Sequence, residues 1–273
     1  MSKKIFFIDV EKCVACFNCF VACKDEFVDH KCEHYSEAQP DEGPAWIEVQ
    51  EVERGQFPKV KVNYIPKPCM QCDPAPCEKA ADNNAVTRRD DGILLIDPEK
   101  AKDQENIQKA CPYNRIYWNQ ELDIPQKCTF CAHLLDQGYK EPRCVEVCPT
   151  RALRYGDIEE FKDEMDKAEQ LRPELKRDSM VYYKGVPKAF VAGTVFDKET
   201  GECIESAKVK LETSAGILVC STNNYGDFEF EGLEEDFRGS ICIEADAYQP
   251  VVFNDLHVGK SVYMGEINLT KMG

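Results

Sequence analysis

The sequence predicts two domains of different class, an α+β domain built from a duplicated metal-binding unit followed by an all-β sandwich. Thirteen of the sixteen cysteines lie between residues 13 and 148, and one segment of that region recurs 88 residues later. From about residue 186, short runs of alternating apolar and polar residues are separated by turn residues. We therefore assign residues 1–185 to the first domain and residues 186–273 to the second.

The charge of the chain excludes some classes of partner. Lys and Arg number 34 against 50 Asp and Glu in 273 residues, a formal net charge of −16. Nucleic-acid binding requires a basic footprint, and anionic lipid repels an acidic protein. The longest aliphatic run, 93–96, is far shorter than the roughly 20 residues of a membrane span. Because MSKKIFFIDVEKC is neither a secretory signal nor a twin-arginine leader, we expect a cytoplasmic protein with no membrane or nucleic-acid partner.

The cysteines of the first domain predict a metal-binding protein. Most of them stand in C-x-x-C spacings, and disulfides are rare in a chain of the reducing cytoplasm. Zinc is the simpler alternative for any single C-x-x-C pair. The arrangement of the motifs along the chain separates zinc from iron–sulfur clusters.

The first repeated segment shows three lost cysteines. IFFIDVEKC at 5–13 matches ILLIDPEKA at 93–101. The first copy continues with four cysteines, at positions 13, 16, 19 and 23. The same offset of 88 leads in the second copy to Ala101, Gln104, Ile107 and Cys111, so only the closing cysteine, which is followed by proline, is kept.

A second pair of segments shows one more loss. Cys128, Cys131, Cys144 and Cys148 form a complete motif that ends in Cys-Pro, and the tail Ala-Leu at 152–153 follows. The related segment has cysteines at 69, 72 and 77, then Ala81 at the next expected ligand and the tail Ala-Val at 85–86. The cysteine region is thus a duplicated unit in which each half carries two four-ligand motifs.

In two-cluster ferredoxins, three cysteines of a motif hold one cluster and the fourth reaches across to the other. Applied here, this rule assigns twelve cysteines to three [4Fe–4S] clusters: Cys13, Cys16, Cys19 and Cys148 (cluster 1); Cys23, Cys128, Cys131 and Cys144 (cluster 2); Cys69, Cys72, Cys77 and Cys111 (cluster 3). A fourth cluster would need positions 81, 101, 104 and 107. All four losses fall on that one cluster, which explains why Cys111 is kept. Zinc would not explain this reciprocal pattern.

The remaining cysteines and histidines fit no motif. We expect Cys203, Cys220 and Cys242 to pack in the core of the β domain, as small apolar residues do. Cys32 fits a polar surface loop better than a metal site. His133 is interpreted either as a residue that tunes a cluster by hydrogen bonding or as an ordinary solvated histidine. His257 is assigned no role.

Between the cysteine motifs and the β domain lies a charged segment, 157–178. Ile158, Phe161, Met165 and Ala168 recur at helical spacing, which predicts a surface helix that ends before Pro173. From residue 186 on, runs such as FVAGTVFD, AKVKLET, GDFEFEG and SICIEADAY predict the strands of a sandwich.

The motifs DVEKCVACFNCFVACKDE, PCMQCDPAPC, ACPYN and KCTFCAHLLDQGYKEPRCVEVCPTRALRYGD resemble the four-cluster ferredoxin-like subunits of molybdenum and tungsten oxidoreductases of the dimethyl-sulfoxide-reductase family. The resemblance covers roughly two thirds of the chain and implies a duplicated bacterial-ferredoxin-like fold. The tail from GTVFDKETG to FEGL is similar to carboxypeptidase-regulatory-like modules, which implies an immunoglobulin-like or prealbumin-like sandwich. The missing fourth cluster, the β domain and the lack of a membrane anchor depart from the family pattern.

The resemblance also implies a function. A large partner subunit would carry molybdenum on two pterin guanine dinucleotides and the active site, and the two chains would form a heterodimer. The sequence has no Ser/His/Asp arrangement, Walker loop or dinucleotide fingerprint, so we assign no catalytic residue and expect one-electron transfer. A subunit of another molybdenum or tungsten reductase or dehydrogenase and a freestanding polyferredoxin remain as alternatives.

Overall fold

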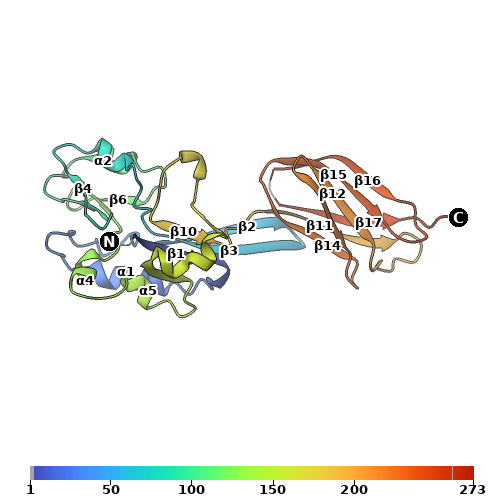
Figure 1. Cartoon of the computed structure of the whole chain (residues 1–273), viewed down its shortest axis with the longest axis horizontal. Helices are drawn as coiled ribbons and strands as arrows, with labels where there is room; N and C mark the ends of the chain where they lie inside the picture. The colour runs from blue at the N-terminus through green and yellow to red at the C-terminus, as the bar shows by residue number, and fades with distance from the viewer. Residues whose placement is uncertain (1–2, 260) are drawn as a thin grey trace. The chain divides into compact units, whose positions relative to one another are not determined.

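The computed structural model describes residues 3–259 and 261–273 (Figure 1). The chain divides into two compact units. The first contains the residues up to Glu51 together with Asn63–Val186, and the second contains Val52–Val62 together with Pro187–Gly273. Across the described ranges, every helix is too short or too polar to cross a membrane.

The first unit is built on a four-stranded sheet with the order β8-β1-β10-β9. Its central strand β1 (Lys4–Asp9) pairs antiparallel with β8 (Leu153–Asp157) and parallel with β10 (Val181–Lys184). Strand β1 is buried from Ile5 to Asp9 because apolar side chains lie on both of its faces. The helices α1 (Asn18–Phe27) and α5 (Arg143–Glu146) pack against each other in the same unit.

A second, smaller set of elements follows the same plan. Strands β4 (Val86–Arg88) and β5 (Leu94–Ile96) pair antiparallel, with helices α2 (Pro76–Ala80) and α3 (Glu105–Lys109) beside them. A hairpin of β6 (Ile116–Asn119) and β7 (Ile124–Lys127) comes next, followed by α4 (Ala132–Asp136).

The two strand pairs share one register. Ile8 faces Leu153 in the first pair, and Ile96 faces Val86 in the second. Ile8 and Ile96 are 88 positions apart, which is the offset of the first sequence repeat. Val86 and Leu153 are 67 apart and belong to the matching tails, 85–86 and 152–153, of the second. The backbone bonds that close the pairs also correspond, since the N–H groups at 9 and 97 donate to the carbonyls of 152 and 85, each at 2.8 Å.

The charged segment differs from its prediction. A 3₁₀ turn (Ile158–Phe161) and α6 (Lys162–Met165) form one short helical stretch, but Ala168 lies in strand β9 (Ala168–Glu169) and pairs with Lys184 of β10. A 3₁₀ turn at Pro173–Leu175 follows. The single long helix is therefore wrong beyond Met165, because pairing at the open edge of the sheet outweighs helical periodicity.

The second unit is an all-β sandwich, as predicted. One sheet has the order β14-β11-β17 and the other β13-β12-β15-β16. The strands are β11 (Ala189–Asp197), β12 (Lys208–Thr213), β13 (Gly216–Ser221), β14 (Asp227–Leu233), β15 (Phe237–Glu244), β16 (Val251–Val258) and β17 (Val262–Leu269). Buried aliphatic and aromatic side chains of both sheets, among them Val195, Leu211, Phe228 and Ile241, form its core.

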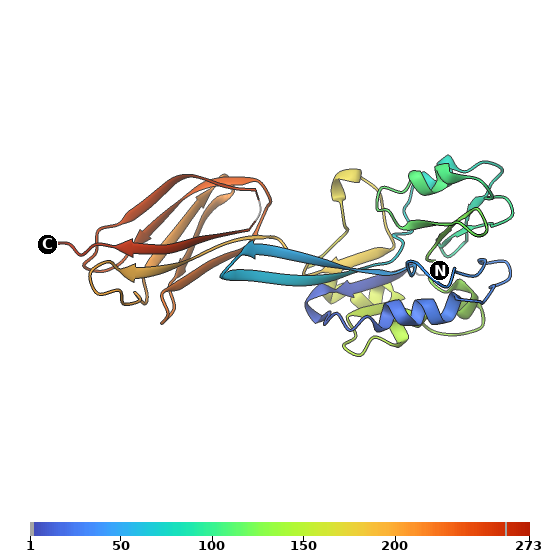
Figure 2. The same cartoon turned by 180° about the vertical axis from the view of Figure 1, so that it is seen from behind.

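The hairpin of β2 (Glu48–Gln56) and β3 (Lys59–Lys67), whose long strands are visible in Figure 2, begins in the first unit, but its tip belongs to the second. Within the second unit, the Lys61 ammonium pairs with Glu229 and Glu231 and lies 5.1 Å from the centre of the Phe190 ring. The division after Val186 adjoins the boundary expected after residue 185, whereas nothing in the sequence indicated that 52–62 would join the β unit.

Candidate iron–sulfur sites

The turns that carry the C-x-x-C pairs share a backbone conformation. The residue before the second cysteine is Ala15, Gln71 or Phe130, and each has a positive φ between 51° and 53°. Few non-glycine residues adopt this conformation. The repeated spacing therefore folds into a repeated local structure.

The first set of thiols combines the N-terminal loop with a cysteine far along the chain. Cys13 and Cys16 precede α1, Cys19 lies in its first turn, and Cys148 follows α5; the four line one cavity. Burial, and then the neighbouring thiols of Cys13 and Cys148, raise the pKa of Cys19 to about 12. The structure thus brings the closing cysteine of the last motif to the first motif.

The second set uses the same pair of helices. Cys23 is in α1, Cys144 is in α5, and Cys128 and Cys131 flank the turn before α4. Burial raises the pKa of Cys128 to about 12, and the charge of Cys23 adds to that shift. Burial also raises the pKa of Cys144, with further contributions from Cys131, Cys128 and Cys23.

The third set unites one motif with the isolated cysteine. Burial raises the pKa of Cys72 to about 12, followed by the charges of Cys69, Cys111 and Cys77. Burial and the charges of Cys69 and Cys111 raise the pKa of Cys77 to about 11. The backbone N–H of Arg115 donates to the Cys111 sulfur at 3.2 Å, which orients that thiol.

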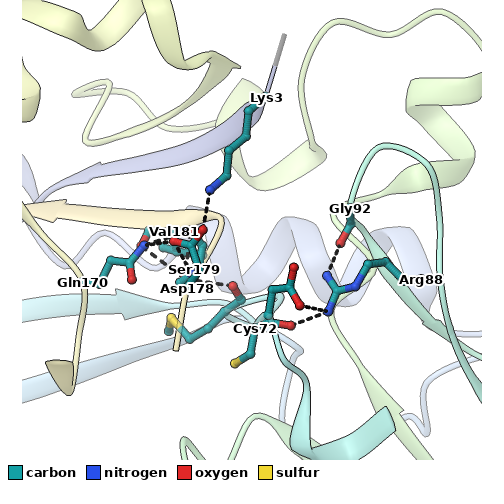
Figure 3. Close-up of polar contacts among 10 residues, drawn as sticks. Lys3, Cys72, Arg88, Gly92, Gln170, Asp178, Ser179 and Val181 are labelled. Carbon is teal, nitrogen blue, oxygen red and sulfur yellow. Dashed lines mark hydrogen bonds and ion pairs between the residues drawn. The ribbon is translucent and has the colours of Figure 1, made fainter. Parts of the chain in front are cut away.

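Other segments of the first unit fix the loop of the third set (Figure 3). The Arg88 guanidinium on β4 donates to the carbonyl oxygens of Cys72 at 2.5 Å and Gly92 at 3.0 Å. The Ser179 hydroxyl, beside Asp178 and its partner Lys3, donates to the Met70 carbonyl oxygen at 2.8 Å. The loop is held at its backbone, so its cysteine side chains are left for a ligand.

Each set of four thiols has the chemistry of an iron–sulfur site. The thiolate is the ligating form, and gathering four of them in a buried site is unfavourable unless a cation offsets the charge. Among residues 3–259 and 261–273, no three His, Cys, Asp or Glu side chains converge closely enough for one metal ion. In a [4Fe–4S] cluster each thiolate binds a different iron atom, so the four sulfur atoms stand apart.

The positions that a fourth cluster would need are occupied by packed and hydrogen-bonded side chains. Ala101 and Ile107 are buried, and with Ala81 they belong to an apolar cluster that includes Leu94 and Ile116. Gln104 accepts from the backbone N–H of residue 82 at 2.8 Å and donates to the carbonyl of residue 100 at 2.7 Å. Residue 103, one position before Gln104, keeps a positive φ of 62°. This turn therefore keeps the conformation of the C-x-x-C turns, although its cysteines have been replaced.

The structure corrects the expected core packing of three cysteines and decides against one of the two interpretations of His133. Cys203 is exposed and not in the core, because it lies in the connection after β11 and not on a strand. Cys220 packs at the core margin and Cys242 is half-buried beside Glu244, so neither is a full core residue. His133 is buried with Nε2 at 2.9 Å from a Glu26 carboxylate oxygen, so it is not a solvated histidine.

Cys32 is half-buried in a loop outside the three sets, as expected, and His257 lies 3.9 Å from Asp236. Sequence reasoning missed two buried polar residues among the thiols, Gln71 and Lys127. Only their places in the sequence could have indicated a role beside the thiols: Gln71 lies inside a C-x-x-C pair, and Lys127 directly precedes another.

Comparison with known proteins gives a family model and curated relatives that are iron–sulfur or electron-transfer subunits. The family model described as a 4Fe-4S dicluster domain matches residues 60–158. Pyrogallol hydroxytransferase small subunit of Pelobacter acidigallici is 39% identical over 98% of this chain and 100% of its own. A tetrathionate reductase subunit of Salmonella typhimurium is 30% identical over 67% of this chain and 73% of its own.

A probable anaerobic dimethyl sulfoxide reductase chain of Escherichia coli K12 is 34% identical over 58% of this chain and 75% of its own. Among solved structures, the shaft pilin SpaA of Lactobacillus rhamnosus GG overlaps 34% of this chain and 49% of its own at 13% identity and a TM-score of 0.26, which is too low to carry an argument. The dicluster match, the thiol sets and the near-full-length identity agree, and the chain belongs to the family of iron–sulfur subunits that includes pyrogallol hydroxytransferase small subunit.

Proposed function

We propose that this chain is the iron–sulfur electron-transfer subunit of a molybdopterin enzyme, specifically of a transhydroxylase that transfers a hydroxyl group between tetrahydroxybenzene and pyrogallol to give phloroglucinol. The observation that carries the proposal is the extent of the likeness. The pyrogallol hydroxytransferase relative matches 98% of this chain, β unit included, whereas the two reductase relatives match 67% and 58%. A reductase or dehydrogenase subunit is the second candidate, because those two relatives are still 30% and 34% identical.

The proposed cofactors are three [4Fe–4S] clusters on the twelve cysteines assigned above. The cavity lined by Cys13, Cys16, Cys19 and Cys148 supports the first group, and the effect of Cys111 on the pKa of Cys72 supports its place in the third. The common register of the β1–β8 and β4–β5 pairs supports a duplicated ferredoxin-like unit. A bound cluster accepts or releases one electron at a time. The protein sets where the clusters lie and how easily they are reduced.

The proposed partner is a large subunit that carries molybdenum on two pterin guanine dinucleotides and the active site, in a heterodimer without a membrane or nucleic-acid partner. An apolar surface beside the first set supports a protein contact there: Val14, Phe17 and Val21 are 63%, 46% and 61% exposed, around an exposed Cys16. Such a patch marks a docking site more often than an isolated apolar residue does. A cytoplasmic location belongs to the proposal, since an exposed thiol such as Cys203 persists in a reducing compartment.

Hydroxyl transfer from one aromatic ring to another leaves the net redox state unchanged. The clusters would then set or restore the oxidation state of the molybdenum and not carry a steady current to an outside acceptor. A shortened series of clusters fits that task, because no fourth centre is needed to reach an external carrier. Rapid electron exchange with an external carrier during turnover would contradict this part of the proposal.

The test is metal analysis of the native, anaerobically purified complex, followed by assay of hydroxyl transfer to pyrogallol. Three clusters require about 12 iron atoms per chain, with one molybdenum or tungsten alongside. Iron near 16 would contradict the ligand scheme. Hydroxyl transfer without net reduction distinguishes the transhydroxylase from a reductase. A freestanding polyferredoxin would instead elute alone, near the 31.1 kDa of the chain.

A further inference from the structure

Lys127 is a charged residue buried among the cysteine motifs. It ends strand β7, directly before Cys128, and is 2% exposed. Lysine is almost never fully buried unless its charge is paired. Neither the ligand scheme nor the packing of the strand accounts for a cation at this place.

The contacts of Lys127 are those of an ammonium ion. Its Nζ donates to the carbonyl oxygen of Leu94, to the carbonyl oxygen of Cys128 at 3.1 Å and to the Gln71 Oε1 at 3.4 Å. Three acceptors match the three donors of a charged lysine. All three are neutral oxygens, which satisfy the hydrogen bonds but do not neutralise the charge. A buried charge without an opposite charge is strongly unfavourable, so its counter-charge must be sought nearby.

The groups that hold Lys127 lie beside the thiols of two different sets. Gln71 lies between Cys69 and Cys72 of the third set, and its amide donates to the Cys128 carbonyl oxygen at 3.0 Å while its oxygen accepts from the Leu94 backbone N–H at 2.9 Å. Lys127 itself donates to the Cys128 carbonyl oxygen in the second set and to the Gln71 side chain between two cysteines of the third set. One buried cation therefore acts on the third set and the second set together.

We propose that Lys127 is a fixed positive charge shared by the second and third clusters, which raises the reduction potentials of both. The inference rests on the cluster scheme of the proposed function. Adding one electron to a thiolate-ligated cluster makes it more negative, and a cation held in a low-dielectric interior stabilises the reduced state more than the oxidised state. The first set contributes no atom to the hydrogen bonds of Lys127, so the first cluster should respond least.

The test compares redox titrations of the native cluster-loaded protein, followed by electron paramagnetic resonance, for wild type, Lys127→Gln and Lys127→Arg. Gln keeps donors for the carbonyl oxygens but removes the charge, and Arg keeps the charge. We expect Lys127→Gln to lower two of the three midpoint potentials. A tenfold change in the ratio of reduced to oxidised cluster corresponds to about 59 mV for one electron. Lys127→Arg should stay close to wild type.

Arg88 provides a matched control. Its guanidinium also bonds a carbonyl of the third set, but it lies 3.8 Å from both Asp73 and Glu78 and its side chain is 24% exposed, so its charge is largely compensated. Arg88→Gln should move the potentials much less than Lys127→Gln. Equal potentials in wild type and Lys127→Gln, with iron content unchanged, would overturn the proposal.

The iron content of the two Lys127 variants also tests the proposal. Loss in Lys127→Gln but not in Lys127→Arg supports a charge that pairs with the clusters. Loss in both variants indicates a merely structural role and overturns the inference. Failure of the cluster scheme itself would show separately, as wild-type iron far from about 12 atoms per chain.

Discussion

Replacing Cys111 by alanine tests the assignment of ligands across long distances in the chain. Cys111 follows Cys77 by 34 positions, but its charge contributes to the raised pKa of both Cys72 and Cys77. With three thiolates left, the third cluster loses a ligand that no neighbouring thiol replaces. We expect Cys111→Ala to lower the iron content from about 12 to about 8 atoms per chain, because one cluster of three is lost.

A double substitution identifies which cluster is lost. If Cys111 and Cys72 hold the same cluster, Cys111→Ala with Cys72→Ala leaves about 8 iron atoms, as each single variant does. If they serve different clusters, the double variant falls to about 4. The assay is iron analysis of anaerobically purified protein, with paramagnetic resonance spectra of the reduced samples to count the remaining clusters. Cys32→Ala is the control and should retain about 12 iron atoms, since Cys32 belongs to none of the three sets.

A value near 4 in the double variant, or three intact clusters in Cys111→Ala, would refute the ligand scheme. Either result would mean that the closing cysteine serves a different neighbour from the one proposed. The explanation for its survival without a motif of its own would then also be wrong.

Three further predictions concern packing, pH and docking. Ile107→Ala should destabilise the first unit by about 2–5 kcal/mol in thermal unfolding, because it leaves a cavity in the apolar cluster where a fourth cluster would lie. Its iron content should not change. As a control, replacing the exposed Ile217 by alanine should change stability by less than about 0.5 kcal/mol. Asp197→Asn should lower the melting temperature of the β unit at neutral pH, because Lys271 and Tyr248 hold the pKa of Asp197 below its usual value of about 3.9. Because the pKa of Asp197 is lower in the folded state, its ionised form stabilises the fold fully above the unfolded pKa, and this stabilisation is lost as the pH falls toward the folded pKa. The difference in melting temperature between wild type and variant should therefore shrink below about pH 4. A difference that stayed constant with pH would contradict the ion pair. The double variant Val14→Ser, Phe17→Ser should weaken association with the proposed large subunit, measured by size-exclusion chromatography, while its iron content stays unchanged. Association retained at micromolar concentration would contradict a contact at this surface.

The sequence shows where the β unit begins, but it does not show that residues 52–62 belong to the same unit. Lys61 and its neighbours at the hairpin tip join a unit that begins more than a hundred residues later. A truncation after residue 185 would therefore also strip the tip of Glu229 and Glu231. A deletion that tests the role of the β unit should remove 52–62 as well.

The sequence by itself determined which cysteines stand in motifs, and it predicts which cluster is missing. Ligand spacing within a turn is a local property, since two or three intervening residues fix where the thiols can point. The two repeats predicted the same local structure in both halves, and the strands that follow correspond at offsets of 88 and 67 residues. The alternating runs after residue 186 similarly predicted strands, because side chains of a strand alternate between core and solvent.

Only the tertiary structure decided the features that depend on distant segments. The helix predicted through Ala168 stops at Met165 because β10 offers an unpaired edge, and Cys203 is exposed because it lies in the connection after β11. Lys127 reads in the sequence as an ordinary basic residue. Its burial between two thiol sets arises when Gln71, Leu94 and Cys128 meet, and the energy of a charge depends on what surrounds it in space and not on its neighbours in the chain.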